Sequence, residues 1–433
     1  MISRARWAVY RLAWVMALPP IRLLAGLDRA LRVTVGWGPL PRSWQVTQRL
    51  GYGHPPVSGR PLWMHCASLG EAKGLWALAA KLPPDMAILL TASTSQGAEF
   101  LSRQCAESGL APSRRAARIA PLDHPGVVRA FLAKGGIRGL CLYEAELWPH
   151  YLSECRRVGI PVTLAAGRIT PAAYPRYLRN RAAAGDLLSG LAWFEAQSPV
   201  DAERFLALGH RPAAIGSDYK AAHFLSASAG AVPARRDAFA FVSLHLDELR
   251  ILLPAIAALR ERGGIVVFPR RMSQLPGFRA ALEPLGFSTH STNPEAAWLL
   301  VDSLGQVSRL LPRCHSAFVG GSLNGAGCHN LWEPLAAGAA ILFGPHYQAQ
   351  ESLAAALLAA GLARSVSGPD ELATLPPPSE GVPAGNARLL ASLRGALDTA
   401  LRGFGERIFA TFYAERPAPD SIRIGRSGRP EDG

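Results

Sequence analysis

Short apolar runs alternate with longer amphipathic segments along most of the chain, in two separate blocks. The apolar runs of the first block lie at 62–66, 86–91, 139–143, 160–165 and 191–197, and those of the second at 239–244, 264–268, 298–301, 317–319 and 339–343. Runs of this length, followed by helical patterns, predict buried parallel strands joined by helices. Two such blocks predict an α/β protein with two doubly wound, Rossmann-like domains facing a cleft.

The segments between and after the blocks set the expected boundaries in this chain of 433 residues. Residues 221–238 are rich in Ala, Ser, Gly and Pro and predict a linker. We therefore place an N-terminal domain at 34–216 and a C-terminal domain at 217–415, which closes with a pair of helices within 386–412. The polar residues 416–433 predict a disordered tail.

The first 33 residues combine apolar side chains with Arg and Trp. Their uninterrupted apolar run, 12–18, is far shorter than the ~20 residues that a membrane-spanning helix needs. Arg and Trp on a short helix are typical of an anchor that lies in the membrane interface, on the cytoplasmic face. A helix of the protein core is the alternative interpretation.

The net charge of +14 indicates an anionic partner, and residues 1–60 alone carry nine Arg and one Asp. Nucleic acid is not favoured, because no nucleic-acid-binding motif and no basic–aromatic alternation is present. An anionic membrane surface or a phosphorylated lipid fits better; a GC-rich genome, which would make the chain rich in Arg, is the neutral explanation. The six Cys residues show no CxxC spacing and are expected to be reduced core residues, with neither a disulfide framework nor a zinc site.

The most informative segment is 317–346, which predicts a strand, a glycine-bearing loop, a short helix over 330–338 and a second strand. Ligands of such units lie at the carboxyl ends of the strands, where glycines let backbone N–H groups approach an anion. Asn330 lies near the helix N-terminus and Glu333 lies one turn later, so both are expected in one cleft. A helix cap with its reciprocal acid is the plainer interpretation of this pair.

Glu71 follows the first predicted strand, at a strand-to-helix turn. The helix dipole is expected to stabilise its carboxylate and to keep its pKa low, so that it is ionised and accepts a proton. Ordinary capping chemistry is the alternative. Similar loops follow the next strands and contain Thr94, the carboxylates of Glu144 and Glu146, and Arg168, whose guanidinium matches phosphate geometry.

These segments resemble the bacterial 3-deoxy-D-manno-octulosonic acid (Kdo) transferases. The donor signature of that family, roughly VGGSL-x-x-x-GGHN-x-x-EP, is matched from Val319 to Pro334, except that Cys328 replaces a Gly. Ser68-Leu69-Gly70-Glu71 stands in the place of the family's S-V-G-E, and residues 144–149 are close to its E-T-E-L-W-P. The similarity extends over about residues 63–346 and therefore covers both predicted domains.

The resemblance implies a GT-B glycosyltransferase fold and inverting transfer of Kdo from CMP-Kdo to a lipid A precursor (lipid IVA), in lipopolysaccharide biosynthesis at the inner membrane, with neither cofactor nor metal. It implies Glu71 as the catalytic base. The implied donor-binding residues are Arg270, Ser303, Gly305, Gly327, His329, Asn330 and Glu333. The implied acceptor-binding residues are Ser68, Gly70, Thr94, Glu144, Glu146 and Arg168. Lys73 has a suitable charge for an acceptor phosphate, although a solvent-facing Lys is the plainer expectation.

The departures from the family pattern are concentrated in the donor half. The family's D-T-M-G-E becomes residues 302–306 with Gln306 in place of the acid, and Arg271 replaces the His of P-R-H. Its G-S/N-L-K appears one residue longer, as residues 216–220. These differences leave open another nucleotide-sugar donor such as a UDP-sugar, an epimerase of the same fold, or a non-catalytic relative at the membrane surface.

Overall fold

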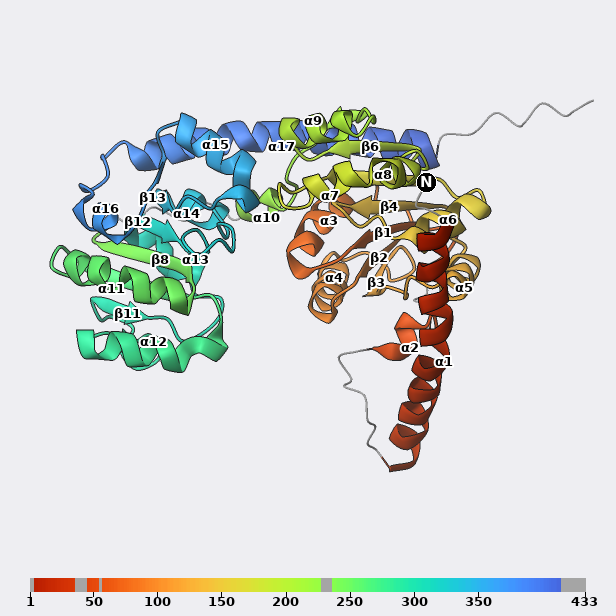
Figure 1. The fold of residues 1–433 in the computed structure, drawn as a ribbon, viewed down its shortest axis with the longest axis horizontal. Coiled ribbons are helices and arrows are strands. Elements are labelled where there is room, and N and C mark those ends of the chain that lie inside the picture. The colour runs from red at the N-terminus through yellow and green to blue at the C-terminus, as the bar shows by residue number, and fades with distance from the viewer. Residues whose placement is uncertain (1–3, 36–44, 54–56, 227–235, 414–433) are drawn as a thin grey trace, which may run out of the picture.

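The computed structural model describes residues 4–35, 45–53, 57–226 and 236–413, and Figure 1 shows their arrangement. The predicted tail at 416–433 and the centre of the predicted linker lie outside the described residues. Within them the chain forms two seven-stranded sheets, and every recorded strand pair is parallel. The predicted α/β fold with two doubly wound domains is confirmed.

The N-terminal sheet has the order β3-β2-β1-β4-β5-β6-β7. Its strands are β1 (Leu62–Cys66), β2 (Ile88–Ala92), β3 (Arg115–Ile119), β4 (Gly139–Tyr143), β5 (Val162–Gly167), β6 (Trp193–Ala196) and β7 (Ala214–Ile215). Its helices are α3 (Leu69–Lys81), α4 (Ser95–Glu107), α5 (Pro125–Gly135), α6 (Pro149–Arg157), α7 (Tyr174–Arg179), α8 (Arg181–Leu188) and α9 (Pro199–Ala207). Every residue of β1, β2 and β4 is buried, because helices cover both faces of a parallel sheet.

The C-terminal sheet has the order β10-β11-β9-β8-β12-β13-β14. Its strands are β8 (Ala238–Leu244), β9 (Gly264–Pro269), β10 (Ser288–Thr289), β11 (Trp298–Leu300), β12 (Cys314–Val319), β13 (Ala340–Phe343) and β14 (Ala363–Ser365). Its helices are α11 (Leu246–Arg260), α12 (Leu275–Leu282), α13 (Val307–Leu310), α14 (Trp332–Ala336), α15 (Glu351–Ala359) and α16 (Pro369–Thr374). The strands that the apolar runs predict are all present, with shifts of a few residues at their ends.

Two elements differ from the sequence-based expectation and join the domains. The first part of the predicted linker is a helix, α10 (Ala221–Ser226), and a single helix, α17 (Val382–Phe412), replaces the predicted closing pair. Figure 1 shows α17 running across the C-terminal domain and on over β6 of the N-terminal domain. Gly139, at the start of β4, leaves room for the Phe412 ring, because an added Cβ would overlap that ring.

Apolar burial is continuous from one domain to the other. One buried cluster includes Leu75 of α3, Tyr143 of β4, Trp332 of α14, Phe343 of β13 and Phe404 of α17. Burial of side chains of this size stabilises a fold by about 1.5–3 kcal/mol each. The return of α17 therefore fixes the relative placement of the two sheets. All six Cys residues are buried free thiols, as their spacing predicts.

The N-terminal segment forms one helix, α1 (Arg4–Val35), which is longer than the short helix expected. Figure 1 shows α1 beside α5 and α6, with its far end projecting away from the sheet. Helix α2 (Val46–Arg49) lies against β3, where Arg118 Nη2 donates to the Gln48 carbonyl at 2.8 Å. Tyr10 of α1 donates a hydrogen bond to Asp123 Oδ2 at 2.5 Å and stacks on the His150 ring, with centroids 5.1 Å apart. Among the described residues, no helix has the length and apolar content needed to cross a membrane.

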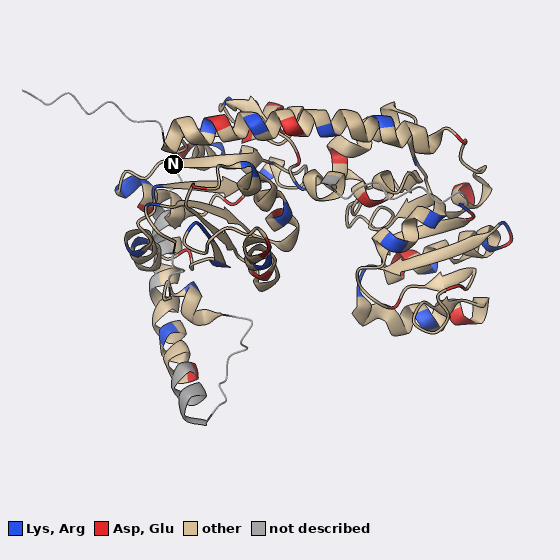
Figure 2. Ribbon diagram, turned by 180° about the vertical axis from the view of Figure 1, so that it is seen from behind, with Lys and Arg blue, Asp and Glu red and all other residues tan. Residues whose placement is uncertain are grey.

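Leu12, Met16, Leu23 and Leu27 of α1 are half or more exposed, in contrast to Leu18, which packs into a small cluster with Leu50. Helix α1 therefore has one docked face and one apolar face that no described residue covers. Figure 2 shows basic and acidic positions alternating along α17 and interspersed over both domains.

Candidate functional site

The first turn of α3 holds Glu71 through its cap. Ser68 is the N-cap residue, and its hydroxyl accepts from the Glu71 N–H and lies 3.1 Å from Glu71 Oε1. The Ala67 N–H donates to Glu71 Oε2 at 2.8 Å. Glu71 thus belongs to a variant of the capping box and is held rigidly at the carboxyl end of β1. Gly70 is exposed in the same turn, with only the Ser68 hydroxyl near an added Cβ.

The expectation of a low pKa for Glu71 is wrong. Burial and the nearby negative charge of Glu144 raise its pKa to about 7, with a smaller contribution from Glu146. The hydrogen bonds from Ala67 and Ser68 oppose this shift but do not cancel it. A carboxyl group with a pKa near neutrality is better suited to accept and release a proton than an ordinary one.

Glu144 directly follows β4 and has a left-handed backbone, with φ of 57°. Its Oε1 accepts a hydrogen bond from Lys220 Nζ at 2.6 Å and lies 3.5 Å from Gln197 Nε2. Ala166 in β5 and Ser243 in β8 also have positive φ, and both lie at carboxyl ends of their strands. Non-glycine residues in this conformation concentrate at functional sites.

Glu146 has one engaged oxygen and one open oxygen. Its Oε2 accepts from Trp148 Nε1 at 2.6 Å, whereas its Oε1 makes no hydrogen bond with any residue that the structure describes. The side chain of Glu146 is 16% exposed, so the open oxygen can be reached by a ligand. The structure thus brings Glu71, Glu144 and Glu146 to one edge of the N-terminal sheet.

Lys220 is a candidate site residue to which the motifs in the sequence assign no role. Although burial opposes its charge, Asp218 and Glu144 raise its pKa, so it stays protonated beside Glu144. It follows Tyr219, whose hydroxyl donates to the buried Glu195 at 2.6 Å. The signal was present in the motif at 216–220, but its one-residue insertion obscured the position of the lysine.

The other predicted acceptor residues are more dispersed. Thr94 is the N-cap of α4, and its hydroxyl accepts from the Gly97 N–H at 3.2 Å. Arg168 donates through Nη2 to the Ala349 carbonyl of the C-terminal domain at 2.6 Å. Arg168 therefore spans the two domains, and its role as a phosphate ligand stays a prediction.

In the C-terminal domain, the carboxyl edge of the sheet consists mainly of backbone groups. This edge faces the cluster of Glu71, Glu144 and Glu146. The buried carboxylate of Glu248 accepts from the N–H groups of Gly321 at 2.6 Å and Leu323 at 3.0 Å, in the loop after β12, and from the His245 N–H at 3.2 Å. Gly321 has φ of 78°, and an added Cβ would lie 2.5 Å from the Gly327 carbonyl oxygen. Glycine is required here both by conformation and by space.

His329 lies against His245. Their Nε2 atoms are 2.7 Å apart, and the rings stack with centroids 5.0 Å apart. Burial, and then the positive charge of Arg270, lower the pKa of His329 to about 4, with smaller effects of His245 and Arg271. His329 is therefore neutral at pH 7, and a hydrogen bond between the two Nε2 atoms needs a proton on one of them.

The structure favours the capping interpretation of Asn330 and Glu333 over an open cleft that holds both side chains. Helix α14 begins at Trp332, two residues after Asn330, so the predicted helix 330–338 is too long. Asn330 Oδ1 accepts from the Trp332 N–H at 2.9 Å. Burial raises the pKa of Glu333, whereas Lys73, Asn330 and Arg270 lower it. The side chain of Asn330 thus binds both the Trp332 N–H and the Glu333 carboxyl group.

Lys73 is not the solvent-facing lysine that α3 predicts. Its Nζ lies 5.4 Å from the centre of the Phe224 ring, and burial lowers its pKa, opposed by the charge of Glu333. Lys73 and Glu71 lie on α3 of the N-terminal domain, and Glu333 lies on α14 of the C-terminal domain. The electrostatic coupling shows that the two sets of predicted site residues approach each other.

The remaining predicted donor residues lie on loops at the carboxyl edge. Arg270 follows β9 and is exposed, but its charge acts on both His329 and Glu333. Gly327 has φ of 84°, and its loop approaches Ala349. Ser303 and Gly305 follow β11 and make no hydrogen bond to the other predicted donor residues within the described part of the chain.

A cavity of about 210 Å³ lies between the two domains. Arg168 and Lys220 line it from the N-terminal domain, and Trp332 and Glu351 from the C-terminal domain. An ion pair between Arg204 Nη2 and Glu351 Oε2, at 2.9 Å, crosses it. No group of three His, Cys, Asp or Glu side chains placed to hold a metal occurs in the described ranges.

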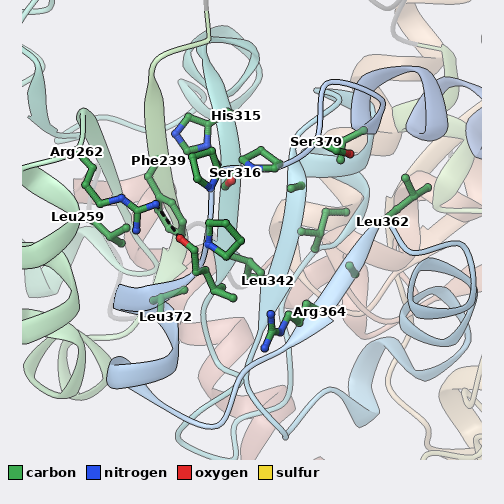
Figure 3. A pocket seen from close by; sticks show the side chains of 18 of the residues that line it. Phe239, Leu259, Arg262, His315, Ser316, Leu342, Leu362, Arg364, Leu372 and Ser379 are labelled. Carbon is green, nitrogen blue, oxygen red and sulfur yellow. Dashed lines mark hydrogen bonds between the residues drawn. The ribbon is translucent and has the colours of Figure 1, made fainter.

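A second cavity, of about 270 Å³, lies at the opposite edge of the C-terminal sheet (Figure 3). Phe239, His315 and Ser316 line it from the amino ends of β8 and β12, and Leu342 lies nearby on β13. Ligands of doubly wound domains bind at the carboxyl ends of the strands. This cavity is therefore separate from the carboxylate and histidine clusters described above.

Comparisons with known proteins agree with this architecture. A UDP-GlcNAc 2-epimerase from Neisseria meningitidis superimposes with a TM-score of 0.52 at 11% identity, over 81% of this chain and 98% of the epimerase. A putative enzyme of the same name from Listeria monocytogenes gives 0.50 at 12% identity, over 83% and 99%. The protein has the GT-B fold of two-domain glycosyltransferases.

Sequence similarity then points to one family of transferases. Residues 44–222 match the family model described as 3-deoxy-D-manno-octulosonic-acid transferase (kdotransferase). A 3-deoxy-D-manno-octulosonic acid transferase of Bordetella pertussis is 29% identical over 337 residues, covering 73% of this chain and 78% of its own length. The enzyme of the same name from Chlamydophila psittaci is 26% identical over 360 residues, covering 78% and 82%. These matches support assignment of the chain to the Kdo transferase family of glycosyltransferases.

Proposed function

We propose that the protein transfers Kdo from CMP-Kdo to a hydroxyl group of a lipid A precursor (lipid IVA), with inversion at the anomeric carbon. The observation that carries this proposal is the placement of Glu71. Its carboxylate is fixed at the carboxyl end of β1, its pKa of about 7 suits proton transfer, and its helix approaches the donor-side residue Glu333 through Lys73.

In the proposed reaction, Glu71 removes the proton from the acceptor hydroxyl while that oxygen forms a bond to the anomeric carbon of Kdo. The bond between this carbon and the CMP phosphate oxygen breaks, and CMP leaves with the electron pair. A positive charge near the leaving phosphate favours this step. Arg270 supplies that charge, and the glycine-bearing loops around Gly305 and Gly327 supply backbone N–H groups.

The remaining predicted residues hold the substrates. Asn330 and Glu333 contact the ribose or cytosine of the donor, with His329 beside them. Ser68, Thr94, Glu144 and Glu146 bind polar groups of the acceptor, and Arg168 pairs with an acceptor phosphate. The bidentate shape of a guanidinium supports this last assignment.

The direct test uses the purified protein with radiolabelled CMP-Kdo and tetra-acylated lipid A precursor. We expect a labelled lipid product. Thermal denaturation provides a second test, because a ligand that binds only the folded state raises the midpoint. CMP should raise it more than UMP or UDP does; equal shifts for all three nucleotides would contradict a CMP-sugar donor and favour another GT-B activity.

We also propose that α1 holds the protein at the cytoplasmic face of the inner membrane as an interfacial anchor. The exposed apolar side chains of α1, among them Leu12, Met16 and Leu23, support this location. Deletion of residues 1–33 should release the protein from inner-membrane fractions. Full-length protein found entirely in the supernatant at low salt would contradict the anchor.

A further inference from the structure

A buried histidine behind the carboxylate cluster has no role in the proposed reaction so far. His65 lies in the middle of β1, is 0% exposed, and packs against the rings of Trp63 and Tyr151. Its Nδ1 lies 2.9 Å from Thr91 Oγ1 on the neighbouring strand β2. Its Nε2 is buried without a hydrogen-bond partner and lies 3.6 Å from Glu146 Oε2.

The contacts of Thr91 fix which nitrogen of His65 carries the proton. Trp63 Nε1 donates to Thr91 Oγ1 at 2.8 Å, and an indole nitrogen can only donate. The hydroxyl therefore accepts from Trp63, and His65 Nδ1 is the remaining partner for its own proton. In a neutral imidazole that accepts at Nδ1, the proton resides on Nε2. This N–H is then directed at the Glu146 carboxylate.

We infer that His65 is a positioning residue for Glu146 in the acceptor site. Trp148 Nε1–H binds Glu146 Oε2, and His65 Nε2 lies 3.6 Å from the same oxygen, so that Oε1 is left for an acceptor hydroxyl. The separation of 3.6 Å exceeds a hydrogen bond, and a closure of about half an ångström upon acceptor binding would complete one. This inference rests on the proposed function and assigns one more residue to the same site.

Two substitutions separate this role from simple packing. The side-chain amide nitrogen of His65→Gln lies near the position of Nε2 and can still donate to Glu146. That of His65→Asn lies near the position of Nδ1 and reaches only Thr91. Both variants remove the aromatic ring, so a loss due to packing alone affects them alike.

With CMP-Kdo and lipid A precursor, we expect His65→Asn to raise the acceptor KM about tenfold or more, the effect of losing a hydrogen bond to a charged group. The kcat and the KM for CMP-Kdo should change little. His65→Gln should restore the acceptor KM to near the wild-type value. Equal acceptor KM values in the two variants, whether both normal or both raised, would overturn the inference.

A double variant tests whether His65 acts through Glu146. If His65 acts by orienting this carboxylate, then His65→Asn added to Glu146→Gln should not raise the acceptor KM beyond that of Glu146→Gln alone. If the increases in acceptor KM of the two single variants multiply in the double variant, His65 acts elsewhere and the inference is overturned.

The tautomer can be measured in the wild-type protein, without substitution and without substrate. Long-range ¹H–¹⁵N correlation spectra of histidine-labelled protein distinguish an Nε2–H from an Nδ1–H imidazole. We expect Nε2–H for His65, and an Nδ1–H form would overturn the inference. A wild-type protein that transfers no Kdo would instead count against the proposed function, and the tautomer result would still stand.

Discussion

The two edges that face each other across the domains are built in different ways. The N-terminal edge carries ionisable side chains, Glu71, Glu144 and Lys220, whose charges influence one another. At the C-terminal edge, the buried carboxylate of Glu248 accepts hydrogen bonds from backbone N–H groups. It thereby fixes the loop that contains Gly321. The first edge is suited to move a proton, and the second to present a fixed array of N–H groups to an anion.

This difference determines what each substitution should do. Removing a charge from the N-terminal edge changes reactivity more than folding, because its side chains face the space between the domains. Removing the organising carboxylate from the C-terminal edge changes loop structure first, because three N–H groups lose their acceptor. The predictions below test this division, beginning with the largest effect.

Glu71→Gln should lower the turnover of Kdo transfer by about 10² or more, the usual scale for the loss of a general base. The amide keeps the size of the side chain and part of its capping hydrogen bonds but cannot take up the proton. Product formation under saturating substrates measures the loss.

Folding and CMP binding serve as controls for Glu71→Gln, because the proposed donor site lies in the other domain. A lost cap alone would cost only about 1 kcal/mol of stability and would leave turnover intact. Transfer at near the wild-type rate would identify Glu71 as a cap, and the base would then be sought at Glu144 or Glu146.

Glu248→Ala should destabilise the protein by about 3 kcal/mol and abolish the thermal shift produced by CMP, because buried N–H groups without an acceptor are costly. Asp247→Ala is the matched control on the same helix turn, since Asp247 is exposed and its carboxylate binds the Asn324 side chain and N–H groups of its own turn, not the N–H groups of Gly321 and Leu323 in the loop after β12. Denaturant unfolding with and without CMP measures both quantities. Equal behaviour of the two variants would contradict the organising role of Glu248.

Glu71→Gln should also change how stability depends on pH. The folded pKa of Glu71, about 7, lies above its ordinary value of 4.5, so its protonation favours the folded state. This contribution is fully present below pH 4.5 and is lost as the pH rises through 7.

The amide does not ionise, so Glu71→Gln should be more stable than the wild type above pH 7, on the order of 1–2 kcal/mol after allowance for partial exposure. The difference should disappear towards pH 4.5. Denaturant midpoints across this range measure it, and a constant difference at every pH would show that the carboxyl group is not perturbed.

Glu351→Ala should have the smallest effect, below about 1 kcal/mol, although it removes an ion pair between the domains. Arg364→Ala removes a comparable pair with Glu371 inside the C-terminal domain, keeps the hydrogen bonds between Ser367 and Glu371, and is the matched control. Thermal midpoints of the two variants should agree closely. A much larger loss for Glu351→Ala would show that this ion pair, in addition to the apolar core around α17, holds the domains together.

Much of the fold follows from the sequence because buried parallel strands are continuous apolar runs, as in β1 and β4. The single helix α17 was not predictable, because Gly385, Gly395, Gly403 and Gly405 within it favour a break. Packing of its Phe404 and Phe412 against the N-terminal domain overrides this local preference.

For the site, motif matching found the carboxylates but could not give their pKa values, which depend on burial and on neighbours distant in sequence. The pKa of Glu71 is the clearest case, because the dipole argument gives the wrong direction once Glu144 lies close. The partners of His65 were equally hidden, since a histidine inside a buried strand resembles any core residue. Only the register of β1 with β2 places it opposite Thr91.

The central claim is that Glu71 is a base tuned near neutrality, and the pH dependence of kcat/KM for Kdo transfer tests it most directly. We predict a wild-type profile that rises with pH as one group with a pKa of about 7 ionises. Phosphates of the acceptor also titrate near this pH, so the limb that belongs to Glu71 is the one that disappears in Glu71→Gln. A wild-type limb near pH 4–5, or the same limb at pH 7 in both proteins, would contradict the claim.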